Sequence, residues 1–204
     1  MERKLIVICG GSGAGKTTLA NSLKQELKDD LAILQYDSYC VDQSNIPFEE
    51  RQKVNYDLPD SYDAPLFIKH IKDLLDGKTI KKPIFDFKTH TRSKEYELVE
   101  PSKFILIEGI MVFQLPHIED LADLLIFVSA DDDIRLARRI MRDIKERGRT
   151  VESVITQYIN TVKPSHYAFI DSKKYISNFI FDNNENNGID EKNVQQLVLK
   201  IRSL

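Results

Sequence analysis

Residues 10–17 read GGSGAGKT, a G-x-x-x-x-G-K-T pattern that ends on Lys16 and Thr17. Its four glycines let the backbone curl so that successive N–H groups point inward, which is how proteins hold phosphate oxygens. A helix that starts near Lys16 adds the positive end of its dipole. The spacing predicts that Lys16 reaches the β- and γ-phosphates and that the Thr17 hydroxyl ligates Mg²⁺. The predicted phosphate-binding set is Gly10, Gly11, Ser12, Gly13, Ala14, Gly15, Lys16, Thr17 and Thr18. We therefore expect a nucleoside triphosphate site rather than a glycine-rich turn without a ligand.

Two acidic residues follow apolar segments further along the chain. Asp37 stands in YDSYC just after residues 32–35, and Glu108 ends FILIE at residues 104–108. Beside a phosphate loop, Asp37 would face the ligand crevice of an open α/β sheet and could accept a proton from a substrate hydroxyl. Glu108 would reach Mg²⁺ directly or through water. The alternatives are a capping or turn aspartate and a solvent-facing strand end.

Residues 131–149 read DDDIRLARRIMRDIKERGR, with arginines at helical spacing and two more around Gly148 at the expected helix end. Phosphoryl transfer needs such cations, because negative charge spreads over the γ-phosphoryl oxygens in the transition state. A mobile segment of this kind could close as a lid and expel water. The alternative is a solvated face on which Asp132, Asp143 and Glu146 offset the arginines. The arginines are Arg135, Arg138, Arg139, Arg142, Arg147 and Arg149.

The elements that must position these residues alternate between strands and helices, which is typical of a parallel sheet covered on both faces. We expect strands at Lys4–Cys9, Ala32–Gln35, Phe104–Glu108, Leu124–Val128 and Asn178–Phe181. We expect helices at about Lys16–Lys28, Pro65–Leu75, Asp131–Glu146, Val151–Asp171 and Lys192–Arg202.

Residues 79–99 have a different periodicity: two alternating stretches around THTRSKE predict a β-hairpin. The predicted fold is a three-layer α/β P-loop NTPase fold, with a mostly parallel five-stranded sheet, helices on both faces and this inserted hairpin. We expect residues 1–204 to form a single kinase-type domain, with the hairpin insertion at 79–99 and the arginine-rich lid region at 131–150. The polar run at 183–188, NNENNG, is expected to be a surface loop.

The composition of the chain argues against some classes of binding partner. The 204 residues carry a net charge of −3, so no basic excess is available to neutralise a nucleic-acid backbone. No apolar run has the length of a membrane span, and the short run after MERK does not resemble a signal peptide. Cys9 and Cys40 have no metal-binding spacing. We expect a reduced, cytoplasmic protein with no nucleic-acid or membrane partner.

In this order, the segments resemble the uridine kinase (uridine–cytidine kinase) family of P-loop nucleoside kinases, over most of the chain. GGSGAGKTT looks like its phosphate loop, and YDSYC stands where the family has an aspartate-serine-aromatic motif. NYDLPDSYD at residues 55–63, PIFDFKTHTRSKE at 83–95 and RRIMRDIKERGRTVESVITQY at 138–158 are similar to more specific family segments. No guanine-reading Asn-Lys-x-Asp motif of GTPases is present.

The resemblance implies the reaction and the roles of individual residues. The activity would be ATP-dependent phosphorylation of the 5′-hydroxyl of uridine or cytidine in pyrimidine salvage, with ATP or GTP as donor and with Mg²⁺. Asp37 would be the general base and Lys16 the second catalytic residue, while Thr17 and Glu108 would hold the metal. Arg147 and Arg149 would clamp the triphosphate. The implied substrate-binding residues are Asp60 at the ribose 2′- and 3′-hydroxyls, Phe85 and His90 at the base, Arg139 and Arg142 at the ribose or phosphates, and Gln157 at the sugar.

Three departures from the family pattern bear on the base rather than on phosphoryl transfer. Phe85 replaces a tyrosine, so one phenol hydroxyl is missing; Leu58 replaces a histidine; and Cys40 stands where an aromatic residue often follows the Asp-Ser pair. Two alternatives therefore stay open. One is a related kinase for another ribosyl or small hydroxylated substrate, and the other is a nucleotide-binding regulator without activity. The resemblance also points to a homo-oligomer, a tetramer, that binds a small-molecule nucleoside.

Overall fold

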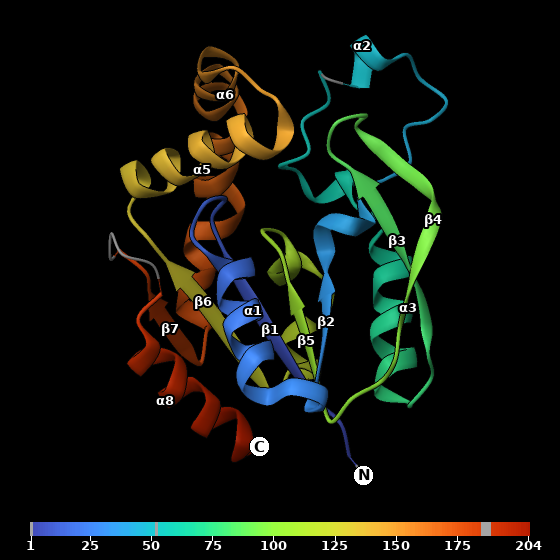
Figure 1. Cartoon of the computed structure of the whole chain (residues 1–204), viewed down its shortest axis with the longest axis vertical. Helices are drawn as coiled ribbons and strands as arrows, with labels where there is room; N and C mark the ends of the chain where they lie inside the picture. The colour runs from blue at the N-terminus through green and yellow to red at the C-terminus, as the bar shows by residue number, and fades with distance from the viewer. Residues whose placement is uncertain (1, 52, 185–188) are drawn as a thin grey trace.

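A five-stranded parallel sheet forms the centre of the computed structural model, which describes residues 2–51, 53–184 and 189–204. Its strand order is β2-β5-β1-β6-β7, and every neighbouring pair is parallel (Figure 1). The strands are β1 (Lys4–Gly10), β2 (Leu31–Gln35), β5 (Phe104–Glu108), β6 (Leu124–Ser129) and β7 (Phe179–Asp182). All five predicted strands are confirmed, with ends that differ by at most one residue.

Helices lie on both faces of this sheet, as predicted (Figure 1). The helices are α1 (Lys16–Leu27), α2 (Phe48–Arg51), α3 (Ala64–Leu75), α4 (Ile118–Leu121), α5 (Asp132–Arg147), α6 (Val151–Gln157), α7 (Lys163–Ser165) and α8 (Glu191–Arg202). Among the described residues, no helix is both long enough and apolar enough to cross a membrane.

Alternate residues of the central strand β1 belong to two different cores. Leu5, Val7 and Cys9 pack in the core that includes α3 and the hairpin, whereas Ile6 and Ile8 pack in the core that includes α1 and α8. All five side chains are fully buried. This burial on both faces explains why the strands read as continuous apolar runs rather than as alternating ones.

The inserted hairpin is also confirmed. Strands β3 (Ile80–Asp86) and β4 (Thr91–Val99) pair antiparallel and stand beside α3, away from the main sheet (Figure 1). Their register shifts between Pro83 and Phe85. Pro83 has no N–H to donate to the ladder, which accounts for an irregularity at this point.

The helix predicted at Val151–Asp171 is not a regular α-helix. Between α6 and α7, and again after α7, residues 158–162 and 166–170 form wider π-helical turns. Pro164 lies inside this stretch and cannot donate the hydrogen bond that an α-helix requires there, so the backbone widens around it.

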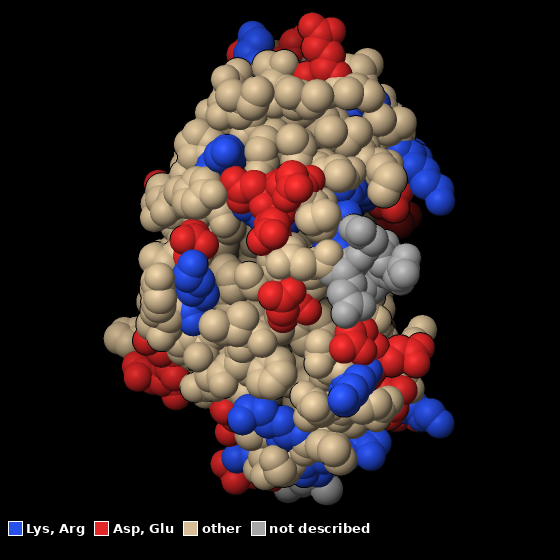
Figure 2. Space-filling view, turned by 90° about the vertical axis from the view of Figure 1, so that its left-hand side faces the viewer, with Lys and Arg blue, Asp and Glu red and all other residues tan. Residues whose placement is uncertain are grey.

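Figure 2 shows the side of the molecule that lies to the left in Figure 1. On that face acidic and basic side chains form small groups among uncharged residues. Several charged side chains of α5 do not contribute to the surface, because Arg135, Arg139 and Asp143 are buried.

Candidate active site

The phosphate loop joins β1 to α1 at the carboxyl edge of the sheet. Gly13 has φ +81° and Gly15 has φ +101°, in the backbone region that favours glycine. A Cβ at Gly13 would lie 2.3 Å from the Arg135 carbonyl oxygen, and one at Gly15 would lie 2.3 Å from Asn183 Nδ2. The loop is therefore fixed by its own conformation, by close neighbours and by a 3.1 Å hydrogen bond from the Ala14 N–H to the Gly11 carbonyl oxygen.

Asn183 is a neighbour that the sequence did not identify. Its run was predicted to be a surface loop, but the Asn183 side chain is buried, and its Nδ2 donates a 2.7 Å hydrogen bond to the Ala14 carbonyl oxygen. That part of the prediction is wrong, because the residue after β7 packs against the phosphate loop rather than facing solvent. Residues 185–188 of the run lie outside the described part of the chain.

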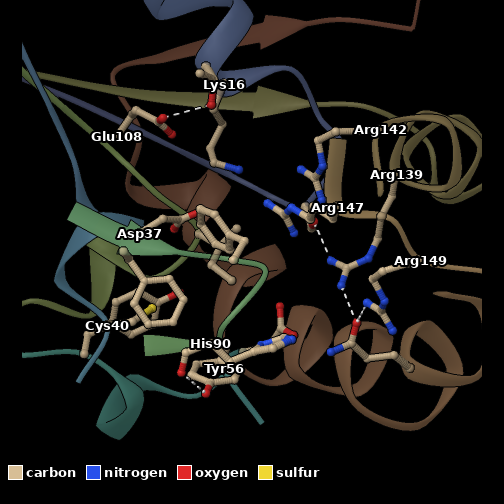
Figure 3. Close-up of a pocket in the computed structure, with 18 residues that line it drawn as sticks. Lys16, Asp37, Cys40, Tyr56, His90, Glu108, Arg139, Arg142, Arg147 and Arg149 are labelled. Atoms are coloured by element: carbon tan, nitrogen blue, oxygen red, sulfur yellow. Dashed lines mark hydrogen bonds between the residues drawn. The ribbon is translucent and has the colours of Figure 1, made fainter. Parts of the chain in front are cut away.

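Lys16, Thr17 and Glu108 meet at the start of α1. Lys16 Nζ donates to the Gly11 carbonyl oxygen over 3.1 Å, and Thr17 Oγ1 donates to Glu108 Oε1 over 2.9 Å. Burial raises the pKa of Glu108, and the nearby charge of Lys16 opposes that shift. The structure thus brings the three residues predicted for phosphate and metal binding to one place (Figure 3).

Asp37 lies in the 3₁₀ turn Tyr36–Tyr39 that directly follows β2. It lines the same pocket as Lys16 and Glu108, across from a group of arginines (Figure 3). Its Oδ1 atom is buried and has no hydrogen-bond partner among the described residues. A buried acceptor without a donor is costly unless a ligand supplies one. Asp37 is therefore placed to accept a hydrogen bond from a substrate hydroxyl.

The carboxylate that the structure places deeper in this pocket is Asp57, not Asp60. Asp57 lines the pocket and is 7% exposed, whereas Asp60 is exposed and does not line it. The Asp57 N–H donates to Asn55 Oδ1 over 2.9 Å, and this short turn sets the direction of the chain there. Burial raises the pKa of Asp57, and the Arg139 charge opposes the shift. The expected position of Asp60 is therefore corrected.

Aromatic side chains form the other end of the pocket (Figure 3). Tyr56 stacks on His90 with ring centres 5.8 Å apart and meets Phe85 edge-on at 5.7 Å. The Tyr56 hydroxyl donates to the His90 carbonyl oxygen over 3.2 Å. Phe85, His90 and Cys40 all line the pocket, and burial lowers the pKa of His90. This wall offers flat apolar faces to a planar ring.

Four arginines from α5 and from the turn that follows it form the opposite wall (Figure 3). We call Arg139, Arg142, Arg147 and Arg149 the arginine cluster. Arg139 Nη1 donates to the Ser12 hydroxyl of the phosphate loop over 2.7 Å. Burial lowers the pKa of Arg147 to about 10 and also lowers that of Arg139. The predicted alternative of a solvated face does not hold for these side chains, because the cluster lines a pocket and its counterion Asp143 is fully buried.

Gln157, predicted at the sugar, contacts the arginine cluster in this structure. Its Oε1 atom accepts hydrogen bonds from Arg139 Nη2, at 2.8 Å, and from Arg149 Nη1. An oxygen shared by two guanidiniums is already occupied, although the residue also lines the pocket. Gln157 is therefore placed to hold Arg139 and Arg149.

A second hollow, which we call the loop hollow, is bordered by the phosphate loop, the start of α1 and α5. It is lined by Gly13, Gly15, Lys16, Thr17, Thr18, Arg138, Arg142 and Glu146. Lys16, Thr17 and Arg142 line both this hollow and the main pocket. Cationic and hydroxyl groups therefore stand where the two spaces meet.

Three histidines, His70, His117 and His166, do not line this pocket. His70 packs in the interior, with Nδ1 2.7 Å from the Tyr39 hydroxyl, and His117 is exposed, so neither residue lines the pocket. His166 is buried beside the phosphate loop, where a Cβ on Gly11 would lie 3.0 Å from its ring. Burial, helped by Arg135, lowers its pKa to about 4.

The residues present fit a magnesium-bound nucleoside triphosphate. Within the described ranges, no group of three or more His, Cys, Asp or Glu side chains could hold a metal ion by itself. Mg²⁺ commonly binds through one or two carboxylates while phosphates and water supply its other ligands. Glu108 and Thr17 provide such a partial set beside the loop. Among the described residues, the cluster's four positive charges make direct ion pairs with Asp143 alone, which leaves room for a polyanion.

Comparisons with known proteins agree with this geometry. The sequence profile of the family described as phosphoribulokinase / uridine kinase matches residues 5–190. The chain is 49% identical over 202 residues to a uridine kinase of Ligilactobacillus salivarius, covering 98% of this chain and 93% of that protein. It is 50% identical over 188 residues to a uridine kinase of Clostridium novyi, covering 91% and 90%.

Solved structures match the fold at low sequence identity. D-glycerate 3-kinase from Cryptococcus neoformans superposes with a TM-score of 0.66 and 19% identity, covering 92% of this chain and 88% of that one. At this identity the similarity supports the fold alone. The pocket and the relatives of higher identity bear on the substrate.

Proposed function

The chain belongs to the phosphoribulokinase / uridine kinase family, and on that premise we propose that it transfers the γ-phosphoryl group of ATP to the 5′-hydroxyl of uridine or cytidine. It is an ATP-dependent nucleoside kinase. The observation that carries the proposal is the junction of the two spaces at Lys16, Thr17 and Arg142. A phosphate chain at this junction would extend from the loop hollow toward an acceptor in the main pocket.

The acceptor pocket has groups suited to each part of a ribonucleoside. We assign the 5′-hydroxyl to Asp37, whose unpartnered Oδ1 would accept the proton as the new P–O bond forms. We assign the ribose 2′- and 3′-hydroxyls to the buried carboxylate of Asp57, which takes the role that the family resemblance implied for Asp60. A carboxylate facing a vicinal diol makes charge-assisted hydrogen bonds and favours ribose over deoxyribose.

The aromatic end of the pocket would hold the base. Phe85 and Tyr56 offer ring faces and edges, and His90 stacks beside them. With burial lowering the pKa of His90, its imidazole would be neutral near pH 7 and could accept or donate a hydrogen bond at the pyrimidine edge. Cys40 adds a small apolar contact.

The cationic wall would act on the transferred group. Lys16 and the arginine cluster are positioned to stabilise charge that develops on the phosphoryl oxygens. Thr17 and Glu108 would hold Mg²⁺, which when bound neutralises phosphate charge. We propose that residues 131–150 close over the site as a lid and exclude water.

The decisive experiment measures ADP release from ATP with uridine, cytidine, 2′-deoxyuridine, adenosine and ribose as acceptors, and repeats it with GTP as donor. We expect turnover with uridine or cytidine at rates well above the rate without acceptor. Turnover only with a non-nucleoside acceptor would favour a related kinase, and nucleotide binding without turnover would favour a regulator. Light scattering on the same preparation tests the predicted homo-oligomer, a tetramer.

A further inference from the structure

Asp143 is a fully buried carboxylate at the centre of the arginine cluster. It lies 2.8 Å from Arg142 Nη2, 3.4 Å from Arg147 Nη1, and 3.6 Å from both Arg139 Nε and Arg149 Nη1. A charge with no exposure to water is costly unless it is paired. Here one carboxylate is the shared counterion of four guanidiniums.

The backbone of Asp143 also fixes the cluster. Its carbonyl oxygen accepts from the N–H of Gly148 and, over 3.1 Å, from the N–H of Arg149. Gly148 ends α5 with φ +66°, and a Cβ there would meet no atom within 4 Å, so the glycine serves the turn rather than a close contact. This turn brings the Arg149 side chain back toward the Asp143 carboxylate.

A chain of contacts leads from Asp143 to the phosphate loop. Arg139 pairs with Asp143 through Nε, while its Nη1 donates to Ser12 of the loop and its Nη2 donates to Gln157. Asp143 Oδ2 and Arg139 Nε are both buried and, among the described residues, lack a hydrogen-bond partner. The two atoms are 3.6 Å apart, so a small tightening of the cluster would join them.

The charges do not balance within this group. Four guanidiniums surround one carboxylate, and such a group repels itself unless a polyanion binds. Gln157 joins Arg139 to Arg149, but Asp143 is the group that all four arginines share, so its loss would release Arg142 and Arg147 from the other two. The Asp143 carboxylate therefore fixes the positions of the four guanidiniums rather than the number of positive charges.

We propose that Asp143 is a positioning residue for phosphoryl transfer, which holds Arg139, Arg142, Arg147 and Arg149 in the geometry that stabilises the transferred group. This inference rests on the kinase activity proposed above. Asp143 would not touch either substrate; it would act through the arginines.

The test is Asp143→Asn, which keeps the shape of the side chain and removes its charge. We expect kcat to fall by about 10- to 100-fold, since misplacement of catalytic groups by about 1 Å has a cost of this size. The matched control is Asp133→Asn, the same change at an exposed position of α5, which should leave kcat within about twofold, as surface changes usually do. Near-normal kcat in Asp143→Asn, with wild-type enzyme and control active, would overturn the inference alone. No acceptor-dependent turnover by the wild-type enzyme would instead reject the proposed function.

The affinity for ATP distinguishes a positioning role of Asp143 from a role in offsetting the charge of the arginines. If Asp143 acted only by offsetting charge, its removal would strengthen ATP binding and leave kcat intact. Positioning predicts the opposite pattern, a large loss in kcat without tighter binding of ATP by titration calorimetry. A double-mutant cycle with Arg149→Lys adds a second criterion. Positioning predicts that Asp143→Asn costs much less in the Arg149→Lys background, whereas additive losses would count against it.

Gly148→Ala tests the same idea if Asp143→Asn does not fold. It strains the turn that returns Arg149 and changes no charge, and we expect kcat to fall severalfold. Gly77→Ala is its control, because Gly77 has φ +83° at the end of α3, far along the chain from the cluster. Equal effects of the two alanines on kcat would overturn the positioning role. Thermal melts and circular dichroism establish that each variant is folded.

Discussion

The Thr17 hydroxyl and the Glu108 carboxylate share a 2.9 Å hydrogen bond between the start of α1 and the end of β5. The sheet fixes this meeting, because Ile8, two residues before the phosphate loop begins, pairs in register with Glu108. Two groups that are 91 positions apart in the chain are thus held together by the fold. We propose that they are the protein's ligands for Mg²⁺.

Glu108→Gln should therefore weaken the response to Mg²⁺ more than it harms the fold. Glutamine can still accept from Thr17 but brings no negative charge. We expect the Mg²⁺ concentration for half-maximal rate to rise by about 10- to 100-fold, the usual range for a lost metal-site partner. A titration of activity against Mg²⁺ measures this, and an unchanged midpoint would remove Glu108 from the metal site.

Asp37→Asn should abolish most of the turnover while leaving ATP binding nearly intact. Asparagine keeps the shape of the side chain but cannot take the proton of the substrate hydroxyl. We expect kcat to fall by about 10²- to 10⁴-fold, the range for loss of a general base. Steady-state rates with uridine and calorimetric binding of ATP check both halves of the prediction. A variant with wild-type kcat would show that another group takes the proton.

The position of Asp37 was predictable from the chain because it depends on one strong local signal. Strands that are apolar on both faces end abruptly, and the first acid after each end lies at the ligand edge of a parallel sheet. The same reasoning located Glu108 and the loop. These placements needed no knowledge of tertiary contacts.

Asp57 and Asp60 provide the sharpest test of the acceptor pocket, since only Asp57 lines it. The wild-type enzyme should prefer uridine over 2′-deoxyuridine by on the order of tenfold to a hundredfold in kcat/KM, because an unsatisfied buried acceptor costs about 1–3 kcal/mol. Asp57→Ala should reduce this preference. Asp60→Ala is the matched control and should keep the preference. If Asp60→Ala removed it and Asp57→Ala did not, the assignment from the structure would be reversed.

Sequence reasoning chose the aspartate that does not line the pocket, because Asp57 and Asp60 lie in one short segment. Both acids fit a motif, and which one turns inward depends on the turn at Asn55 and on the 3₁₀ turn at residues 59–61. Asp143 was missed for a related reason. Periodicity places it among charged residues, and nothing in the chain shows that four arginines close over it. Such burial is a tertiary property.

His166 should make the protein less stable in acid. The pKa of His166 is lowered from 6.5 to about 4, chiefly by burial, so the unfolded chain takes up a proton first as the pH falls. The stability that the neutral ring provides is complete above about pH 6.5, and about 3 kcal/mol of it is lost between there and pH 4. Urea unfolding at pH 7 and pH 4.5 measures the change. His166→Gln should flatten the pH dependence, and His117→Gln, at an exposed position, should not.

Phe85→Tyr tests which base the pocket suits. Phe85 is 7% exposed and meets Tyr56 and Phe87 edge-on, so its ring is held in place and a hydroxyl would extend from a fixed position. One neutral hydrogen bond contributes about 0.5–1.5 kcal/mol, which is roughly twofold to tenfold in affinity. We expect kcat/KM for uridine to rise by a factor in that range, mainly through a lower KM.

Phe48→Tyr is the control for that change, because Phe48 is 42% exposed and does not line the pocket. It adds the same hydroxyl to the same kind of ring and should leave kcat/KM unaltered. A Phe85→Tyr variant that is markedly worse with both uridine and cytidine would show that the pocket is shaped around the phenyl ring. The preferred acceptor would then be sought outside the pyrimidine ribonucleosides, among other ribosyl compounds that still present a 5′-hydroxyl to Asp37.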